Sequence, residues 1–361
     1  MSYLPYSPSL EKPAPNESET FEEISRTMQH ITRTMAGHYR HAYRPVHAKS
    51  HAVVIGTLEV PSNLAPPLAQ GLFAKPGSHP VLLRFSTNPG DLLADSVSSP
   101  RGLAIKVLNV DGEMLATHAG NTTQDFVCIN AKAFGAPDPA AFVQQIKLLD
   151  KTLELPETVK QAVSTVARGV NVGLRAIGVH AGALDNLGHP FTHPLGETFS
   201  TVAAVRYGEY VAKISFAPLS ENLKGLTNKH VDAGHGFNPL EEALREFFKT
   251  NTGVWQVRAQ LATDPETTPI EDASKEWPED KAPWQSVATI TVLPQESYSD
   301  ARQIFFDEQL SFTPWHALAA HQPLGGIMRS RRLAYEEAQK FRAARNRREH
   351  VEPRAIEEVP A

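Results

Sequence analysis

The sequence holds a single cysteine, Cys128, among 361 residues. An internal disulfide is therefore excluded, and with it a disulfide-stabilised secreted fold. No apolar run approaches the length that crosses a bilayer, and residues 1–19 are rich in Ser, Pro and Glu, without the basic and apolar regions of a secretory signal. We therefore expect a cytoplasmic protein with no membrane partner.

A strong charge of either sign is also missing. The formal net charge is −5, with 21% charged and 41% hydrophobic residues, which is the composition of an ordinary globular protein. This balance gives no reason to expect a nucleic-acid partner. The length is sufficient for one large core. We expect a flexible N-terminal arm (residues 1–19), a single domain (20–350) and a tail (351–361).

Short apolar runs bounded by turn residues fill the middle of the chain, and helical patterns frame them. Ile24, Met28, Ile31 and Met35 recur at helical spacing within residues 21–39. Many strands separated mostly by turns predict an α+β fold, an antiparallel barrel with flanking helices. Strands are expected over 51–60, 80–87, 101–110, 125–129, 254–262 and 286–293, a hairpin over 198–219, and further helices over 139–179, 239–249 and 323–348.

Near the carboxyl end, Arg331, Tyr335 and Arg342 share one face of the expected helix 323–348. A tyrosine binds ferric iron as the phenolate, which the metal and a neighbouring guanidinium both favour. Arg331 could donate to the phenolate oxygen, and Arg342 could bind a haem propionate. The alternative is a basic helix end with a solvated face, because other cations surround these residues.

His47, three residues after Arg44, is a second candidate. A neutral imidazole can take a proton from one oxygen of a peroxide and return it to the other. This chemistry needs a partner that holds the second ring nitrogen. The alternatives are a structural histidine, or a metal site shared with His51.

Two further segments fit the same picture. Arg84 and Ser86 share one face of the expected strand 80–87. An arginine that faces a barrel interior needs an anion, such as a propionate, and Ser86 could orient His47. In the turn before the next strand, Asn121 offers an amide donor to a peroxide oxygen. The alternatives are an edge strand with a solvated arginine, and a plain turn.

In this order, these segments resemble those of haem catalases. The similarity covers residues 40–135 and 310–345 well and the middle of the chain loosely. The segments that carry it are Val46-His47-Ala48-Lys49, Leu83-Arg84-Phe85-Ser86-Thr87, Ser99-Pro100-Arg101-Gly102-Leu103-Ala104-Ile105-Lys106, Gly120-Asn121-Thr122-Thr123 and the Arg-x-x-x-Tyr pattern of Arg331 and Tyr335.

The resemblance implies an eight-stranded antiparallel barrel over about residues 45–295, with haem b (iron protoporphyrin IX) inside it and a proximal helix at 323–348. It implies that Tyr335 is the axial ligand of the iron, hydrogen-bonded by Arg331. It further implies that His47 is the distal acid and base, with Asn121 as the distal amide. The remaining roles that it implies are Ser86 as the partner of His47, Arg44, Arg84 and Arg342 on the propionates, and Phe126 and Phe134 near the haem.

The chain also departs from the catalase pattern. Catalases are usually longer, so this chain resembles a small catalase-related peroxidase. Ser99 replaces an aspartate and Asn88 replaces a valine, both of which line the main channel in catalases. The NADPH-binding residues of some catalases have no match, so NADPH is not expected.

We therefore expect a haem-dependent hydroperoxidase of oxidative-stress defence. It would decompose hydrogen peroxide, or use it or a small organic hydroperoxide to oxidise an organic donor, and it would form a homo-oligomer. One alternative is a fatty-acid hydroperoxide isomerase of the allene oxide synthase type, although Val46 stands where those enzymes have threonine. Two others are a non-catalytic haem-binding protein, and a barrel whose basic segment 342–348 binds nucleic acid.

Overall fold

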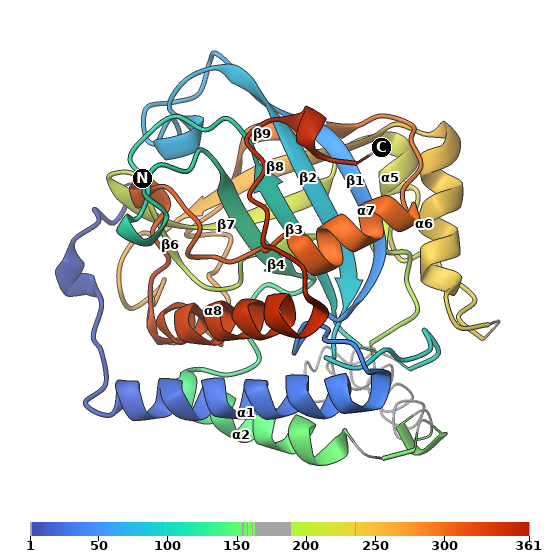
Figure 1. Cartoon of the computed structure of the whole chain (residues 1–361). Coiled ribbons are helices and arrows are strands. Elements are labelled where there is room, and N and C mark those ends of the chain that lie inside the picture. Colours follow the sequence, from blue (N-terminus) through green and yellow to red (C-terminus); the bar gives the residue numbers. More distant parts are fainter. Residues whose placement is uncertain are drawn as a thin grey trace.

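The computed structural model describes residues 2–97, 99–153, 155–156, 158–160, 162, 189–234 and 236–360. The chain forms an antiparallel barrel with a layer of three helices against one side of it (Figure 1). Of the helix expected over 139–179, most of the second half lies outside the described residues. Within the described residues, no helix combines the length and the apolar character needed to cross a membrane.

The expected eight-stranded antiparallel barrel is confirmed. Nine strands follow the order β5-β4-β3-β2-β1-β9-β8-β7-β6, and a β5–β7 pairing closes eight of them into a ring that leaves out β6. The expected hairpin is β6–β7, where Gly208 adopts a φ of +61°, as a tight hairpin turn requires. The strands are β1 (Lys49–Val60), β2 (Gly77–Thr87), β3 (Arg101–Val107), β4 (Gln124–Ile129), β5 (Phe199–Ser200), β6 (Val205–Tyr207), β7 (Tyr210–Pro218), β8 (Gly253–Leu261) and β9 (Trp284–Val292).

The interior of the barrel is the main hydrophobic core. Alternate side chains of each strand point inward, so Leu83, Ile105 and Phe216 belong to one buried cluster. On the outer face, Leu82 and Ala104 pack instead against the segment after β9. That segment contains α7 (Asp300–Ile304) and a π-helical turn (Phe305–Gln309). The turn matters for function because it carries a carboxylate to the edge of the barrel.

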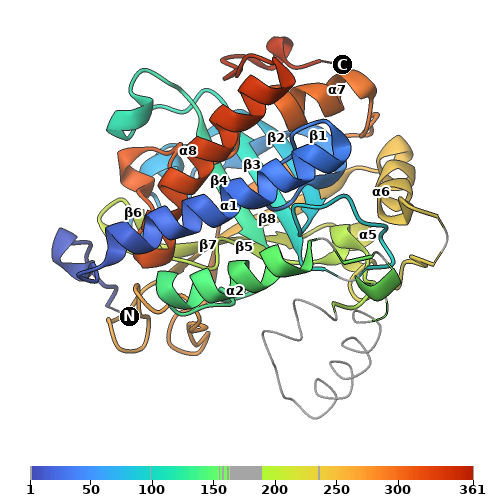
Figure 2. The ribbon, with the colours of Figure 1, turned by 60° about the horizontal axis from the view of Figure 1, so that its bottom comes forward.

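The helical layer consists of α1 (Glu17–Tyr39), α2 (Pro139–Thr152) and α8 (Gly326–Asn346) (Figure 2). Its apolar faces meet where Ile24 and Met28 of α1 pack with Ala334 of α8. Two short helices, α5 (Glu221–Lys224) and α6 (Pro239–Thr250), lie elsewhere on the barrel. The layer fixes the height of α8 above the barrel, and therefore the height of the side chains that α8 directs toward it.

Both ends of the chain lie against the barrel. The segment expected as a flexible arm bonds to it, since the backbone N–H of Leu4 donates to the carbonyl of Ala262 at 2.8 Å. At the other end, the N–H of Val351 donates to the carbonyl of Gln309 at 3.0 Å. Glu352 then reaches Lys106, which is fully buried on β3, at 2.6 Å. The tail is therefore fastened next to the strands that carry the site.

Candidate functional site

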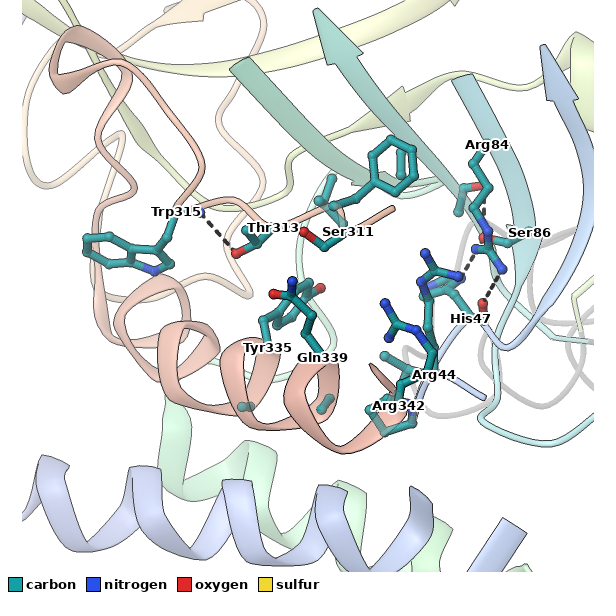
Figure 3. A pocket seen from close by; sticks show the side chains of 18 of the residues that line it. Arg44, His47, Arg84, Ser86, Ser311, Thr313, Trp315, Tyr335, Gln339 and Arg342 are labelled. Atoms are coloured by element: carbon teal, nitrogen blue, oxygen red, sulfur yellow. Dashed lines mark hydrogen bonds between the residues drawn. The ribbon is translucent and has the colours of Figure 1, made fainter. Parts of the chain in front are cut away.

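A cavity lies between α8 and the edge of the barrel (Figure 3). It encloses about 950 Å³ of space that no protein atom fills, part of it open to solvent. Its walls come from α1, the segment before β1, strands β2 to β4, the segment between β3 and β4 that carries His118, residues 311–315 and α8. A hollow that is mostly apolar, with a few convergent polar groups, has the character of a site for a small molecule or cofactor.

His47 lies in the wall just before β1. Its φ of +54° is the left-handed conformation, which is uncommon outside glycine and is often found at functional sites. The register of β2 and β3 places Ser86 opposite Gly102, and both touch the imidazole. The Ser86 hydroxyl lies 3.3 Å from His47 Nδ1, and a Cβ at position 102 would lie 2.6 Å from the same nitrogen. A side chain at position 102 would therefore displace the imidazole.

The protonation of His47 follows from these surroundings. Burial, together with the nearby charges of Arg84, Arg331 and Arg44, lowers the pKa of His47 to about 3. The imidazole is therefore neutral at pH 7. The Ser86 hydroxyl also lies 3.5 Å from the carbonyl of Gly102, which can accept its single hydrogen. The hydroxyl oxygen then accepts from the N–H of His47 at Nδ1, which leaves Nε2 free to take a proton.

Three arginines gather around the same cavity (Figure 3). Asp307 Oδ1, from the π-helical turn, lies 3.0 Å from Arg44 Nη1 and 2.6 Å from Arg84 Nε. Burial alone would raise the pKa of Asp307, but Arg84 and Arg44 hold it below its usual value. Arg342 bonds only to the carbonyl of Leu310, at 3.3 Å, and its buried Nε has no partner among the described residues.

The charge at this end of the cavity is therefore unbalanced. Arg44 and Arg84 share the Asp307 carboxylate, and Arg342, which is 4% exposed, forms no ion pair with it and feels Asp307 and Glu308 only as nearby charges. Burial lowers the pKa of Arg342 to about 10, because desolvation disfavours a cation without a full countercharge. An anionic ligand would relieve this imbalance.

Tyr335 enters the cavity from α8 (Figure 3). Arg331, one helical turn earlier, donates from Nη2 to the phenol oxygen at 2.6 Å, and its guanidinium carbon lies 5.1 Å from the centre of the tyrosine ring. The cation thus stands where it would stabilise a phenolate. The spacing of Arg331, Tyr335 and Arg342 in the sequence places them on one side of α8, as expected for one helical face.

Three residues expected near a haem lie elsewhere. Asn121, expected to face a peroxide, turns its amide toward His316, with Nδ2 3.5 Å from Nε2 of that ring. Phe126 points into the barrel core, where it packs on Phe216. Phe134 packs edge to face on Phe142 at 5.1 Å. None of the three belongs to the cavity wall as the described residues form it.

Several residues in or next to the cavity wall are not among the candidates that the sequence offers. Asp307 gives no signal, because its position depends on a π-helical turn that packs against distant strands. Trp315 lies in an irregular segment and His118 ends a single 3-10 turn, so periodicity says nothing about the direction of either side chain. Cys128 is on the expected strand and faces inward, where burial raises the pKa of its thiol strongly. Glu336 and Gln339 are on the right helix and follow from the face that Tyr335 defines.

Three solved structures that superpose on the chain are catalases. The chain superposes on a fungal catalase with a TM-score of 0.59 and 18% identity, covering 91% of this chain and 66% of that one. Catalase A from Saccharomyces cerevisiae gives a TM-score of 0.58 and 19% identity, covering 86% of this chain and 63% of that one. A bacterial catalase gives 0.57 and 16%, covering 87% and 60%. No family model matches the chain, and no curated protein sequence matches it. The chain thus has the catalase fold and spans less than two thirds of the length of these proteins.

Proposed function

We propose that the cavity binds haem b and that the protein is a haem-dependent hydroperoxidase of oxidative-stress defence, acting on hydrogen peroxide or a small organic hydroperoxide. The observation that carries the proposal is the pairing of Tyr335 with His47. Both side chains line one cavity, the phenol oxygen receives a hydrogen bond from Arg331, and the imidazole is held neutral beside Ser86.

The arginines of the cavity fit the propionate edge of a haem. Haem b carries two propionates, and the cavity offers three guanidinium groups with one carboxylate among them. Arg342 is the best placed to gain an anion, since its buried Nε lacks a partner. Arg44 and Arg84 would share the remaining charge with Asp307. Charge-assisted bonds of this kind are about twice as strong as neutral ones.

The residues also fit the iron. Tyrosine is an axial ligand of haem iron in catalases, and Tyr335 is the tyrosine that lines this cavity. With iron bound, Arg331 would donate a hydrogen bond to the tyrosine oxygen and would tune how strongly that oxygen donates electrons. When bound, haem supplies an iron that accepts a peroxide oxygen and stores oxidising equivalents.

His47 would carry out the proton transfers. Its free Nε2 would accept the proton of the hydroperoxide oxygen nearer the iron and return it to the departing oxygen, which leaves as water or an alcohol. Ser86 would fix the ring during both transfers. We give Asn121 no part in these steps, because its amide faces His316 and not the cavity.

The experiment is haem titration of the purified protein, followed by addition of hydrogen peroxide. We expect a Soret band at one haem per chain and either oxygen release or oxidation of an added donor. A fatty-acid hydroperoxide as the substrate separates this from isomerisation, because an isomerase would give an epoxide or ketol without a donor. Haem uptake with no consumption of any hydroperoxide would leave a haem-binding protein and overturn the proposed activity.

A further inference from the structure

The cavity has two chemically different ends (Figure 3). His47 and the arginines occupy one end, and Trp315 stands at the other, beyond Tyr335 and Gln339. His118 also lines the cavity, and it belongs to the Trp315 end because its ring stacks on that of His316 with the centroids 4.3 Å apart. The hydroperoxidase chemistry proposed above gives no role to Trp315 or His118.

Trp315 is held rigidly with its polar atom satisfied. The indole Nε1 donates to the carbonyl of Met328 at 2.7 Å, and the Arg332 guanidinium lies 5.5 Å from the centre of the indole. Arg332 in turn faces Glu336, with 3.6 Å between Nε and Oε1. What the indole offers the cavity is therefore an aromatic surface without a free donor. The guanidinium beside it disfavours a cationic ligand.

His118 is the complementary polar group. Within the described part of the chain, neither of its ring nitrogens forms a hydrogen bond, although the ring is half-buried in the cavity wall. Burial lowers the pKa of His118, so the imidazole is neutral at pH 7 and can accept a proton. A half-buried polar ring without a protein partner, next to a fixed aromatic face, is suited to a ligand that supplies both a ring and a hydroxyl.

We propose that the Trp315 end of the cavity binds a phenol, or a similar aromatic hydroxyl compound, as the electron donor of the peroxidase reaction. The proposal rests on the hydroperoxidase function and names its reducing substrate. The donor ring packs on Trp315, and the donor hydroxyl hydrogen-bonds to His118.

The reaction balances as ROOH + 2 ArOH → ROH + H₂O + 2 ArO•. The O–O bond breaks and is reduced by two electrons. Each phenol gives up one electron to the haem site and its hydroxyl proton to the His118 imidazole, and the water formed takes up the protons released. His118 therefore acts as a base for the donor, as His47 does for the hydroperoxide.

The test is donor binding, measured apart from turnover. The haem-replete protein is titrated with 4-fluorophenol and with 4-fluoroanisole, which lacks the hydroxyl hydrogen, and ¹⁹F NMR gives each Kd. Trp315→Leu should raise both constants about tenfold, because the aromatic packing is lost. His118→Leu should raise only the phenol constant, by about threefold to tenfold, because one hydrogen bond is lost. Trp284→Leu is the matched control, since that indole lies beside Arg258 at 5.3 Å, away from the cavity, and both constants should stay unchanged.

The two proposals fail in different ways. Equal phenol affinity in the native protein, Trp315→Leu and His118→Leu would overturn the donor site while leaving the hydroperoxidase intact. Absence of haem uptake, seen in the absorption spectrum before any phenol is added, would overturn both.

Discussion

Glu352, in the tail after α8, places Oε1 2.6 Å from Nζ of Lys106 on β3, a side chain with no exposed surface. Asp125 on β4 binds the same ammonium group at 2.7 Å, and its second oxygen accepts from the backbone N–H of Thr313. The tail, two barrel strands and the wall segment 311–315 are thus joined by one buried cation.

The buried Lys106 cluster predicts how strongly three substitutions should affect the free energy of unfolding. Lys106→Met leaves two carboxylates together without a cation and should lower the free energy of unfolding by about 3–5 kcal/mol. Glu352→Gln leaves Lys106 paired with Asp125 and should cost about 1–2 kcal/mol. Lys340→Met, which breaks an exposed pair with Glu337, is the control and should leave the free energy of unfolding unchanged. Urea unfolding measures all three, and a larger loss in Glu352→Gln than in Lys106→Met would contradict the arrangement.

Arg342 should bind the cofactor without stabilising the empty protein. Arg342→Leu removes a buried cation that lacks a full countercharge, so the unfolding free energy of the apoprotein should stay equal or rise. Haem affinity should fall about tenfold to a hundredfold, because a charge-assisted bond contributes about 1.5–3 kcal/mol. Arg345→Leu, on an exposed part of the same helix, should change neither quantity. A loss of apoprotein stability with unchanged haem affinity would assign Arg342 a structural role instead.

Gly102→Ala should separate haem binding from catalysis. The added methyl carbon would lie 2.6 Å from His47 Nδ1 and 3.2 Å from the Ser86 hydroxyl, so the imidazole must move. Haem uptake should persist, while the rate of reaction with hydroperoxide, measured by stopped flow, should fall at least about a hundredfold, as is common when a positioned base is displaced. Gly37→Ala on α1 has open space around the new methyl and should leave that rate unchanged while stabilising the helix slightly. Normal reaction in Gly102→Ala would remove His47 from the mechanism.

The pH dependence of the hydroperoxide reaction should be flat where an ordinary histidine titrates. Because the folded-state pKa of His47 is about 3, its base form persists through the range from pH 5 to 8. The same shift gives a stability effect of known sign. Between pH 6.5 and 3, His47 is protonated in the unfolded chain but stays neutral in the folded one. This residue therefore lowers the free energy of unfolding progressively as the pH falls through that window. Stopped-flow rates between pH 5 and 8 test the first statement, and an inflection near pH 6.5 that disappears in His47→Gln would contradict it.

The sequence predicts the fold, and which candidate side chains share a face, for clear physical reasons. Alternation along β2 places Arg84 and Ser86 on one face, which with Leu82 is the outer face of the barrel and not the interior expected from the sequence. Helical spacing places Arg331, Tyr335 and Arg342 on one side of α8. These are local relationships, which a period of 2 or 3.6 residues determines. The expected start of α8 at 323 differs from the observed Gly326, because Gly325 has a φ of +85° and ends the preceding loop there.

The other features of the site depend on contacts between segments that are far apart in the sequence. No local pattern shows that the π-helical turn brings Asp307 to Arg44 and Arg84, or that the register of β2 and β3 sets Gly102 against His47. The resemblance places Asn121 in the cavity, yet the turn before β4 directs its amide to His316.

Helix α1 begins at Glu17, before the expected residue 21, and the acidic residues in its first turn suit the helix dipole there.

The central claim is that Tyr335 binds the iron of a haem as a phenolate. Resonance Raman spectroscopy of the ferric, haem-replete protein tests it most directly, in the native chain and in Tyr335→Phe. We predict tyrosinate vibrations enhanced by excitation into a phenolate-to-iron charge-transfer band, and their complete loss in the variant. Haem bound in the native chain without those vibrations, or the same spectrum in Tyr335→Phe, would contradict the account.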